Sequence, residues 1–579
     1  MKRWVSKRYN ADYKSIAMRY NISEIFAEVL VKRGLFTTDA MDKYLFPDIK
    51  EMYAPEKMKD LVKACDILKV SISEKKKIMV IGDYDVDGIM SSYILIHGLE
   101  MLGADVSYRI PHRVKDGYGI RDYMVDEAYA LGIQTIITCD NGISAIDAAK
   151  RAKELGVTYI LTDHHEVPAQ NEIEIIPPAD AVVNPKQSVC NYPFSQLCGA
   201  GVVYKILSCL FEECGDKRYI NELLPFAAVA TVCDVVPLED ENRIIVSNGI
   251  KILSDRSLMK NIGMLALLNE LQINEQVSSG DLGFKIGPCI NAAGRLSDAV
   301  EGLELLLEKD NDLAVKHAER LVELNEIRKD MTAEAEREAV SLVDKTDLNE
   351  RPVIVLFLKD CHESVAGIVA GRIKERYYRP VYILTKGENG LKGSGRSIHG
   401  YHMQSELMKC KELLIEFGGH AMAAGFSLLE ENLELFADTL NQNCRLTDKE
   451  LLEKVVFDKE VALYDMNCEI VRQFDYMQPF GESNPKAVFA KREVMVKSVY
   501  MCGRDNQIAR LKLEDGGKTF DAVDFSAEGC IGVAITERYG AQEWEKMKSG
   551  ICGQSIDILY SPEINERYGN LQFKIIDCR

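Results

Sequence analysis

Three aspartates, Asp83, Asp85 and Asp87, occupy every second position of the stretch VIGDYDVDG, directly after an apolar run. In an extended segment, side chains two residues apart point to the same side, so we expect these carboxylates to lie close together. Like charges at such a short separation oppose each other's ionisation. Because the motif contains no basic residue that could balance them, the sequence predicts a bound cation at this place.

Polar residues that can bind metals recur where other apolar runs of the first half of the chain end. We expect these runs to be strands, and they provide Asp140 and Asn141 in TIITCDNGIS, Asp163, His164 and His165 in TYILTDHHEVP, and Asp234 in LPFAAVATVCDVVPL. Each residue has a structural alternative, because an Asp can cap a helix, a His pair can belong to a turn, and a buried Asp can pair with a base. Ligands of parallel α/β sheets bind at the carboxyl ends of the strands, so we expect the set to converge on one site.

The residue types of this set favour a hard or borderline cation. Carboxylates with one or two imidazoles and no thiolate are typical ligands of Mn²⁺ or Mg²⁺. Five or more such ligands can hold two ions about 3.5 to 4 Å apart, the arrangement that activates water for attack on phosphorus. The sixteen cysteines are scattered from Cys65 to Cys578 without a CxxC pair, so we expect reduced, mostly buried thiols. The sequence therefore predicts phosphoester hydrolysis at a centre with two ions of Mn²⁺ or Mg²⁺.

Apolar runs alternate with amphipathic stretches from about residue 75 to 240, a pattern typical of a parallel sheet covered by helices on both faces. Residues 298–345 contain no proline and keep apolar residues at helical spacing among many charges, which predicts a long polar helix between two domains.

A second α/β pattern begins at RPVIVLFLKD, and we interpret its glycine-rich stretch GENGLKGSGRS as a loop. Beyond about residue 455, helical periodicity is lost, and short alternating segments around glycine turns predict a small β-barrel or sandwich.

The predicted fold class is therefore α/β, with two α/β domains joined by a long helix and followed by a C-terminal β-barrel. The expected boundaries are 1–300 for an N-terminal segment and the first α/β domain, 301–347 for the linking helices, 348–452 for the second α/β domain and 453–579 for the barrel.

Charge and hydropathy limit the class of protein. The net charge of −19 argues against nucleic-acid binding over the whole surface, although residues 351–400 carry a local net charge of +5. No apolar run approaches the roughly 18 residues of a membrane span, and the start MKRWVSKRYNADYK lacks the apolar region of a signal peptide. We therefore expect a cytoplasmic protein without a membrane partner.

The chain resembles the DHH phosphoesterase superfamily, named for a triplet that stands here as Asp163-His164-His165, and within it the RecJ family of bacterial single-strand-specific exonucleases. The resemblance covers nearly the whole chain and rests on the order and spacing of its motifs, which are GDYDVDG, TCDNGIS, LTDHH, ATVCDVVPL, GPCINAAGRLSD, HESVAGIVAGRIKERYYRP, GSGRSIHGYHM, FGGHAMAAGF and MQPFGESNP.

The resemblance implies roles for the residues of the first domain. It implies metal ligation by Asp85, Asp87, Asp140, His164 and Asp234, with Asp140 as the bridge between two ions. Asp83 would support these ligands, and His165 would face the scissile phosphate as a stabiliser or proton donor. The pyrophosphatase branch of the superfamily has a histidine ahead of its first aspartates, and this chain lacks it, which leaves one metal site with fewer ligands.

The resemblance also implies where the substrate binds. Arg113 in PHRVKDGYG and Arg295 in NAAGR would bind phosphate near the metals, because a guanidinium fork fits phosphate oxygens. GSGRS and FGGH resemble the signature of DHHA1 domains, in which small residues let backbone amides approach a phosphate. The residues concerned here are Ser394, Arg396, Gly418, Gly419 and His420. The C-terminal barrel resembles an OB-fold, whose groove would bind single-stranded nucleic acid.

The implied function is metal-dependent 5′ to 3′ exonuclease activity that degrades single-stranded DNA to 5′-mononucleotides in DNA repair and recombination. A cleft too narrow for a duplex would explain the strand selectivity, and a single-strand-binding protein and a helicase are the implied protein partners. Two alternatives remain: a DHH-DHHA1 phosphodiesterase that acts on oligoribonucleotides or cyclic dinucleotides, and a non-catalytic DNA-binding scaffold. The PFGESNP motif and the barrel argue against the first alternative, and the complete ligand set argues against the second.

Overall fold

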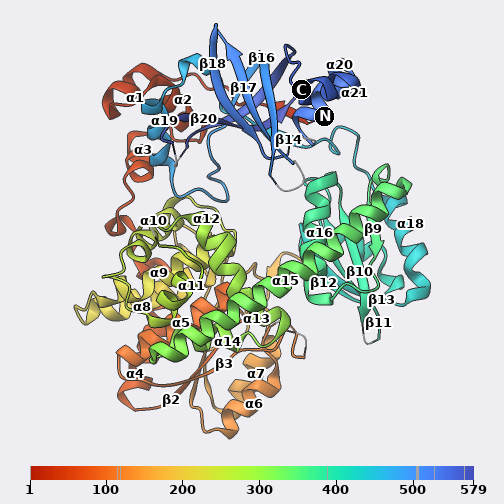
Figure 1. Ribbon diagram of the computed structural model, residues 1–579. Coiled ribbons are helices and arrows are strands. Elements are labelled where there is room, and N and C mark those ends of the chain that lie inside the picture. Colours follow the sequence, from red (N-terminus) through yellow and green to blue (C-terminus); the bar gives the residue numbers. More distant parts are fainter. Residues whose placement is uncertain are drawn as a thin grey trace. The chain divides into compact units, whose positions relative to one another are not determined.

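The computed structural model describes residues 2–579 except 114, 118, 275, 388, 504–506, 527–528 and 566–567. These gaps include two residues of PHRVKDGYG and one of GENGLKGSGRS, which therefore lie outside the described part of the chain. The chain forms two compact units (Figure 1), one made of residues 47–446 and 481–483 and the other of residues 1–46, 447–480 and 484–579. Within the described residues, no helix combines the length and the apolar character that crossing a membrane requires.

The first α/β domain is built on a five-stranded sheet in the order β3-β2-β4-β5-β8, and every pair of neighbouring strands is parallel. The strands are β2 (Lys77–Ile81), β3 (Asp105–Arg109), β4 (Thr135–Thr138), β5 (Thr158–Thr162) and β8 (Ala181–Val183). Almost every residue of β2, β4 and β5 is buried, as expected for strands covered on both faces.

Helices cover both faces of this sheet. One face packs against α4 (Leu61–Ser73), α5 (Val86–Met101) and α8 (Gly199–Glu213), and α9 (Arg218–Cys233) packs against α5 and α8. The other face packs against α6 (Asp122–Ala130) and α7 (Ile146–Leu155). Because α5 lies between the sheet and further helices, it is apolar nearly all round. The prediction of a parallel α/β sheet is confirmed.

Further helices complete the first domain and lead to the second. They are α10 (Asp240–Ser254), α11 (Ile262–Glu270), α12 (Ser279–Asp281), α13 (Gly287–Leu296), α14 (Val300–Leu307) and α15 (Asn311–Lys345). Asp310 caps the start of α15, because its carboxylate accepts hydrogen bonds from the amides of Asp312 and Leu313.

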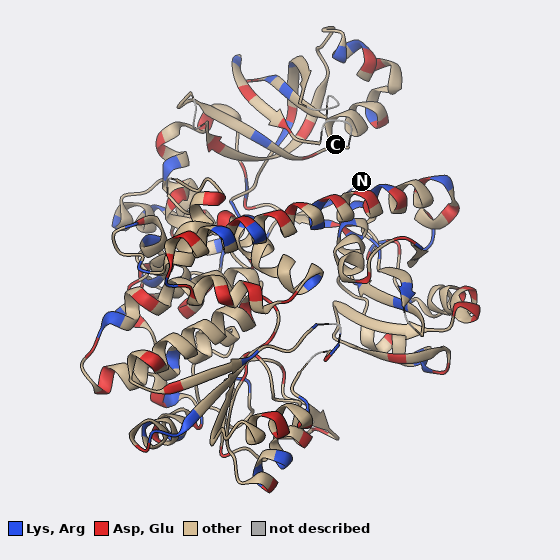
Figure 2. Ribbon diagram, turned by 60° about the horizontal axis from the view of Figure 1, so that its bottom comes forward, with Lys and Arg blue, Asp and Glu red and all other residues tan. Residues whose placement is uncertain are grey.

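The 35-residue helix α15 belongs to the cores of both α/β domains, as the sequence predicted. Its first half contributes Ala318, Leu321 and Leu324 to the core of the first domain. Its second half packs Ala335, Ala339 and Val343 against the second domain. Figure 2 shows acidic and basic residues distributed along this helix, which explains its polar sequence.

The second α/β domain has a mixed five-stranded sheet in the order β12-β13-β11-β10-β9. Its elements are β9 (Ile354–Phe357), α16 (Glu363–Tyr377), β10 (Val381–Gly387), β11 (Gly390–Arg396), α17 (Met403–Lys409), β12 (Leu414–Gly419), β13 (Ala423–Leu428) and α18 (Leu433–Asn443). The interpretation of GENGLKGSGRS as a loop was wrong, because most of it forms β11 in the centre of this sheet. Packing explains why β11 contains glycine at position 393. A Cβ at Gly393 would lie 2.1 Å from the ring of Phe426.

The smaller unit contains a barrel in which β16 pairs with β17, β17 with β18, β18 with β20, β20 with β19, and β19 with β16. The strands are β16 (Phe489–Cys502), β17 (Ile508–Asp515), β18 (Lys518–Asp524), β19 (Ser555–Ile564) and β20 (Leu571–Cys578). The predicted barrel is confirmed. The expected lack of helices in this region was wrong, because α20 (Ile531–Tyr539) and α21 (Ala541–Lys548) connect β18 to β19.

The N-terminal 46 residues belong to this smaller unit. They form β1 (Arg3–Val5), α1 (Tyr13–Tyr20), α2 (Glu24–Lys32) and α3 (Thr38–Leu45), which pack beside β14 (Lys454–Val456), β15 (Lys459–Glu460) and α19 (Cys468–Gln473). Apolar residues of α2 and α3, such as Phe26 and Leu45, share one core with the barrel. The sixteen cysteines are all free thiols.

Candidate metal centre

Three neighbouring strands of the first sheet, β2, β4 and β5, end at the same edge and bring polar residues together there. Asp83 follows β2, Asp140 follows β4, and His164 follows β5. Asp140 adopts a left-handed conformation with φ of 60°, which turns the chain sharply at the strand end. The convergence at the carboxyl edge that the sequence predicted is present.

Asp85, Asp87 and Asp234 belong to helix ends, whereas the sequence predicted that they follow strands. β2 ends at Ile81 and α5 begins at Val86, so the three aspartates do not lie along one extended segment. Asp85 caps α5 by accepting a hydrogen bond from the Gly88 amide, and Asp87 lies in the first turn of that helix. Asp234 follows the end of helix α9 rather than a strand. The sequence prediction of extended aspartates and of a strand before Asp234 was therefore wrong.

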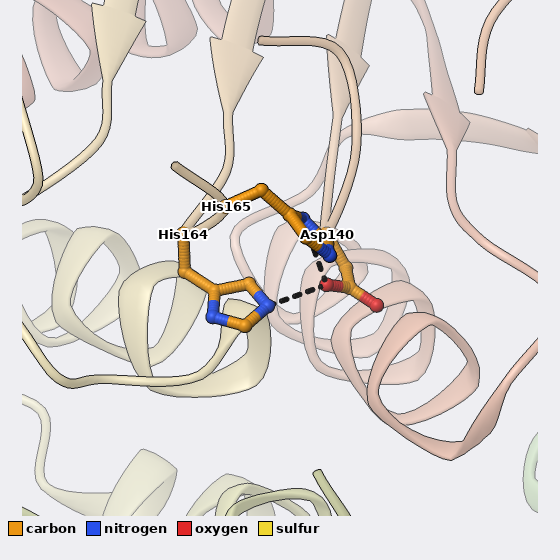
Figure 3. Close-up of side chains that lie close together, drawn as sticks. All are labelled: Asp140, His164 and His165. Atoms are coloured by element: carbon orange, nitrogen blue, oxygen red, sulfur yellow. Dashed lines mark ion pairs between the residues drawn. The ribbon is translucent and has the colours of Figure 1, made fainter. Parts of the chain in front are cut away.

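The imidazole of His164 lies among three carboxylates. Its Nε2 atom is 3.1 Å from Oδ1 of Asp140, 3.6 Å from Oδ2 of Asp87 and 3.7 Å from Oδ2 of Asp234. Figure 3 shows the Asp140 carboxylate with the rings of His164 and His165 turned toward it. Nδ1 of His165 is 3.9 Å from the same oxygen of Asp140.

Ligand atoms gather into overlapping groups that share Asp140 and His164. Within each group, the atoms lie within 4.8 Å of one another. One group joins Asp83, Asp85 and Asp140, the second joins Asp87, His164 and Asp234, and the third joins Asp140 with both histidines. This arrangement offers two neighbouring positions for a cation, with Asp140 beside both.

The hydrogen bonding of these groups fits a divalent cation. Oδ1 of Asp83, Oδ1 of Asp140 and both ring nitrogens of His164 are buried without a hydrogen-bond partner among the described residues. Unpaired buried polar atoms are unfavourable, and several carboxylates crowd here around one imidazole. Carboxylate oxygens and one imidazole are the donor set that suits Mn²⁺ or Mg²⁺.

Burial and this crowding shift the pKa values of the carboxyl groups. Burial and the charge of Asp85 raise the pKa of Asp83 to about 8. Burial and the charges of Asp87 and Asp85 likewise raise the pKa of Asp234 to about 8. The pKa of Asp140 lies well above its ordinary value for the same reasons, and burial lowers the pKa of His164.

Binding of Mn²⁺ is expected to raise the melting temperature of the chain more at about pH 8 than at about pH 5.5. The pKa values of Asp83 and Asp234 are higher in the folded chain than the ordinary 3.8, so the stability of the metal-free chain falls as the pH rises from about 4 to 8. Mn²⁺ binds the ionised carboxylates, so its stabilisation grows over the same interval. Melting curves with Mn²⁺ and with EDTA at both pH values measure the difference. Equal shifts at the two pH values would contradict the assignment.

Asp163 orients His165. One carboxylate oxygen of Asp163 lies 2.7 Å from Nδ1 of His165 and accepts the amides of His164 and His165 at 2.7 and 3.0 Å. The other oxygen accepts the Ile143 amide. Although burial acts in the opposite direction on each group, this pair raises the pKa of His165 to about 9 and lowers the pKa of Asp163 to about 2. The sequence predicts Asp163 only as one of the converging polar residues, and its place directly before two histidines is a usable signal for its contact with His165.

The N-terminus of α8 fixes another candidate ligand, Asp87. The amides of Gly199 and Ala200 donate hydrogen bonds to the two oxygens of Asp87, at 2.6 and 2.8 Å. A helix N-terminus favours a negative charge, so α8 keeps this carboxylate in place. Gly199 permits the close approach, because a Cβ there would lie 2.7 Å from Cβ of Asp140.

A pocket of about 560 Å³ lies between the two α/β domains, and it contains several of the predicted substrate residues. Arg113 and Arg121 line it from the first domain, and Ser394, Gly418 and Lys392 line it from the second. Phe417 and Phe426 add apolar surface. The guanidinium of Arg113 lies 4.7 Å from the centre of the Tyr84 ring, a stacked arrangement that holds it beside the aspartate motif.

The remaining predicted substrate residues lie near this pocket but do not line it. Arg295 donates a hydrogen bond of 2.6 Å from Nη1 to the carbonyl of Ser364, which is part of the pocket wall. Arg396 donates to the carbonyl of Gly395. Gly419 and His420 follow Gly418 at the end of β12, where the amide of His420 donates to the Ala423 carbonyl and its side chain is exposed.

Comparison with known families agrees with this architecture. Residues 77–231 match the DHH family, N-terminal domain, residues 350–446 match the DHHA1 domain, and residues 457–577 match the RecJ OB domain.

Individual proteins match over most of the chain. The chain is 33% identical to the single-stranded-DNA-specific exonuclease RecJ of Bacillus subtilis over 94% of this chain and 69% of that protein. It is 33% identical to the protein of the same name from Haemophilus influenzae, over 94% of each. The crystal structure of RecJ in complex with Mn²⁺ from Thermus thermophilus matches with a TM-score of 0.83 and 25% identity, over all of this chain and 79% of the other. The chain therefore belongs to the RecJ family of DHH-DHHA1 proteins.

Proposed function

We propose that this chain is a metal-dependent exonuclease that degrades single-stranded DNA from its 5′ end to 5′-mononucleotides, in DNA repair and recombination. The observation that carries the proposal is the cluster around Asp140, in which one oxygen each of Asp83 and Asp140 and both ring nitrogens of His164 are buried without hydrogen-bond partners among the described residues. Membership of the RecJ family supports the choice of substrate, because its relatives are named for single-stranded DNA.

The residues of the candidate metal centre have different proposed roles. Asp85, Asp87, Asp140, His164 and Asp234 would hold Mn²⁺ or Mg²⁺, and Asp83 would support them. Bound there, the cations would activate water and neutralise the charge that develops on the phosphate. His165, held by Asp163 and protonated near neutral pH, would hydrogen-bond the scissile phosphate or donate a proton.

The pocket between the α/β domains would hold the phosphates of the strand. Arg113 and Ser394 lie on its wall, and Arg295 and Arg396 lie next to it. Gly418 leaves open space for a phosphate against the backbone of β12, and Gly419 and His420 would bind the phosphate from the end of that strand. A strand that reaches the metal centre through this pocket would have to be single, which is the proposed origin of the selectivity.

The proposed protein partners and cellular location follow from single-stranded DNA as the substrate. A helicase and a single-strand-binding protein are the proposed partners, because they would provide single strands in the cytoplasm. A phosphodiesterase specific for oligoribonucleotides or cyclic dinucleotides is less favoured, because residues 457–577 match the RecJ OB domain. A non-catalytic scaffold is less favoured because all the candidate ligands are present and clustered.

Digestion of end-labelled DNA tests the function. With Mn²⁺ or Mg²⁺, a 5′-labelled single strand is expected to release labelled mononucleotide at once, whereas a 3′-labelled strand shortens progressively before its label is released. EDTA is expected to stop both reactions, and a blunt duplex is expected to resist. Release of the 3′ label first, or equal digestion of duplex and single strand, would overturn the proposed polarity or selectivity.

A further inference from the structure

An exposed phenylalanine lies in a π-helix beside the candidate metal centre. Phe284 is 83% exposed, which makes it the most exposed large apolar side chain among the described residues. It belongs to the π-helix Leu282–Ile286, which leads directly into α13. Short π-helical segments next to α-helices occur frequently at functional sites. An aromatic ring that is left in solvent at such a place therefore requires an explanation.

The π-helix packs against the end of α9, the helix that Asp234 follows. Sγ of Cys233, the last residue of α9, donates a hydrogen bond to the carbonyl of Leu282 at 3.4 Å. A Cβ atom at Gly287 would lie 2.4 Å from the same sulfur, so only glycine permits this approach. Because Leu282 and Gly287 lie on either side of Phe284 in the sequence, these contacts hold the exposed ring beside the helix end that carries Asp234.

Asp234 is also the candidate ligand through which solvent reaches the group around His164. The side chains of Asp87 and Asp140 are 1% and 2% exposed, whereas that of Asp234 is 23% exposed. The next residue, Val235, is exposed and has φ of 59°. A β-branched residue rarely adopts this conformation, and such strain is concentrated at functional sites. Exposed apolar surface therefore adjoins the metal centre on a side from which a substrate can approach it.

Helix α13 connects this surface with the pocket between the α/β domains. Near its end, a Cβ atom at Gly294 would lie 2.9 Å from the carbonyl oxygen of Tyr84 in the aspartate motif. The next residue, Arg295, donates a hydrogen bond to the carbonyl of Ser364 on the pocket wall. The 10 residues of α13 extend about 15 Å. Phe284 and the pocket therefore lie at opposite ends of α13, and candidate metal ligands lie near both ends.

We propose that the ring of Phe284 stacks on a nucleobase of the single strand, on the 3′ side of the scissile phosphate. The inference rests on the proposed function, in which degradation starts at the 5′ end and the pocket with Arg113 and Ser394 holds phosphates of the strand. A strand that begins in this pocket and crosses the metal centre would continue past Phe284. Every base has an aromatic face, so such a contact holds the strand without selecting a sequence.

Binding of a 5′-phosphorylated single-stranded oligonucleotide in EDTA, measured by fluorescence anisotropy, tests the inference. Phe284→Ala is expected to weaken binding roughly tenfold, which is typical for the loss of one stack between a base and an aromatic ring. Phe284→Tyr keeps the ring and is expected to bind like the unaltered chain. The matched control Tyr129→Ala removes another exposed aromatic ring, on α6, and is expected to leave the affinity unchanged.

Single abasic sites, placed in turn along the oligonucleotide, locate the stacked base. In the unaltered chain, an abasic site at one position 3′ of the first phosphodiester bond is expected to weaken binding roughly tenfold. In Phe284→Ala, the same abasic site is expected to have little further effect, because the stack is already lost. Phe284→Tyr serves as the folded reference, since it changes only one exposed atom of the ring.

Two results would overturn the inference. One is an affinity of Phe284→Ala equal to that of Tyr129→Ala, and the other is an abasic effect that is equally large in Phe284→Ala and in the unaltered chain at every position. If the unaltered chain releases no nucleotides with Mn²⁺, the proposed function fails. If it releases them and either of these two results is found, only the role of Phe284 fails.

Discussion

Replacing Asp140 with alanine is expected to lower Mn²⁺-dependent hydrolysis of single-stranded DNA by roughly 10³-fold or more, because the variant loses several kcal/mol of transition-state stabilisation. Asp140 belongs to two of the three ligand groups, so its loss affects both candidate cation positions. Binding of the strand in EDTA is expected to persist, because the guanidiniums and the pocket are unchanged. Initial rates of nucleotide release and binding by fluorescence anisotropy measure the two effects separately.

Asp147→Ala is the matched control for this experiment. Asp147 lies in the first turn of α7, the helix that follows Asp140, and its side chain is 86% exposed with Lys150 as its partner. Its replacement is expected to leave the rate unchanged. Substantial Mn²⁺-dependent activity of Asp140→Ala would show that the reaction does not depend on the cluster described here.

Replacing Asp163 with asparagine is expected to lower kcat by roughly 10²- to 10⁴-fold, the usual contribution of a positioned acid or base. The Asp163 carboxylate lies 2.7 Å from Nδ1 of His165 and raises the pKa of that histidine to about 9. A group with a raised pKa keeps its proton below that pKa and loses it as the pH rises through it. Asparagine removes the stabilising charge, so His165 is expected to lose its proton at lower pH.

The pH profile distinguishes this role from general damage to the fold. For Asp163→Asn, the fall of kcat on the alkaline side is expected to begin at lower pH than in the unaltered chain, with little change in DNA affinity. Asp180→Asn is the control, because Asp180 is another carboxylate of the first domain that accepts a backbone amide, that of Tyr159. The account of His165 is contradicted if Asp163→Asn keeps the profile of the unaltered chain and loses only amplitude.

The sequence predicted those parts of the fold and site that depend on local patterns. Apolar runs followed by polar residues correctly placed Asp83, Asp140 and His164 at strand ends, because neighbouring parallel strands end at one edge. Period-two segments likewise predicted the barrel, and the proline-free charged stretch predicted α15.

Local patterns failed where one pattern fits both a helix and a strand, and where packing partners are distant in the sequence. The alternation of aspartates in DYDVDG suggested a strand, but the capping of α5 by Asp85 requires a helix there. The apolar stretch before Asp234 is a buried helix, and apolar runs cannot distinguish a buried helix from a buried strand. The glycines of β11 suggested a loop because the residues packed against them, such as Phe426 against Gly393, are remote in the sequence.

Anomalous diffraction from crystals of the chain grown with Mn²⁺ would test the metal centre most directly. We predict one or two peaks at the carboxyl edge of β2, β4 and β5, in contact with Asp140 and, if two, about 3.5 to 4 Å apart. We expect Asp85, Asp87, His164 and Asp234 to complete their coordination. A fully occupied Mn²⁺ elsewhere in the chain, with no peak beside Asp140, would contradict the assignment.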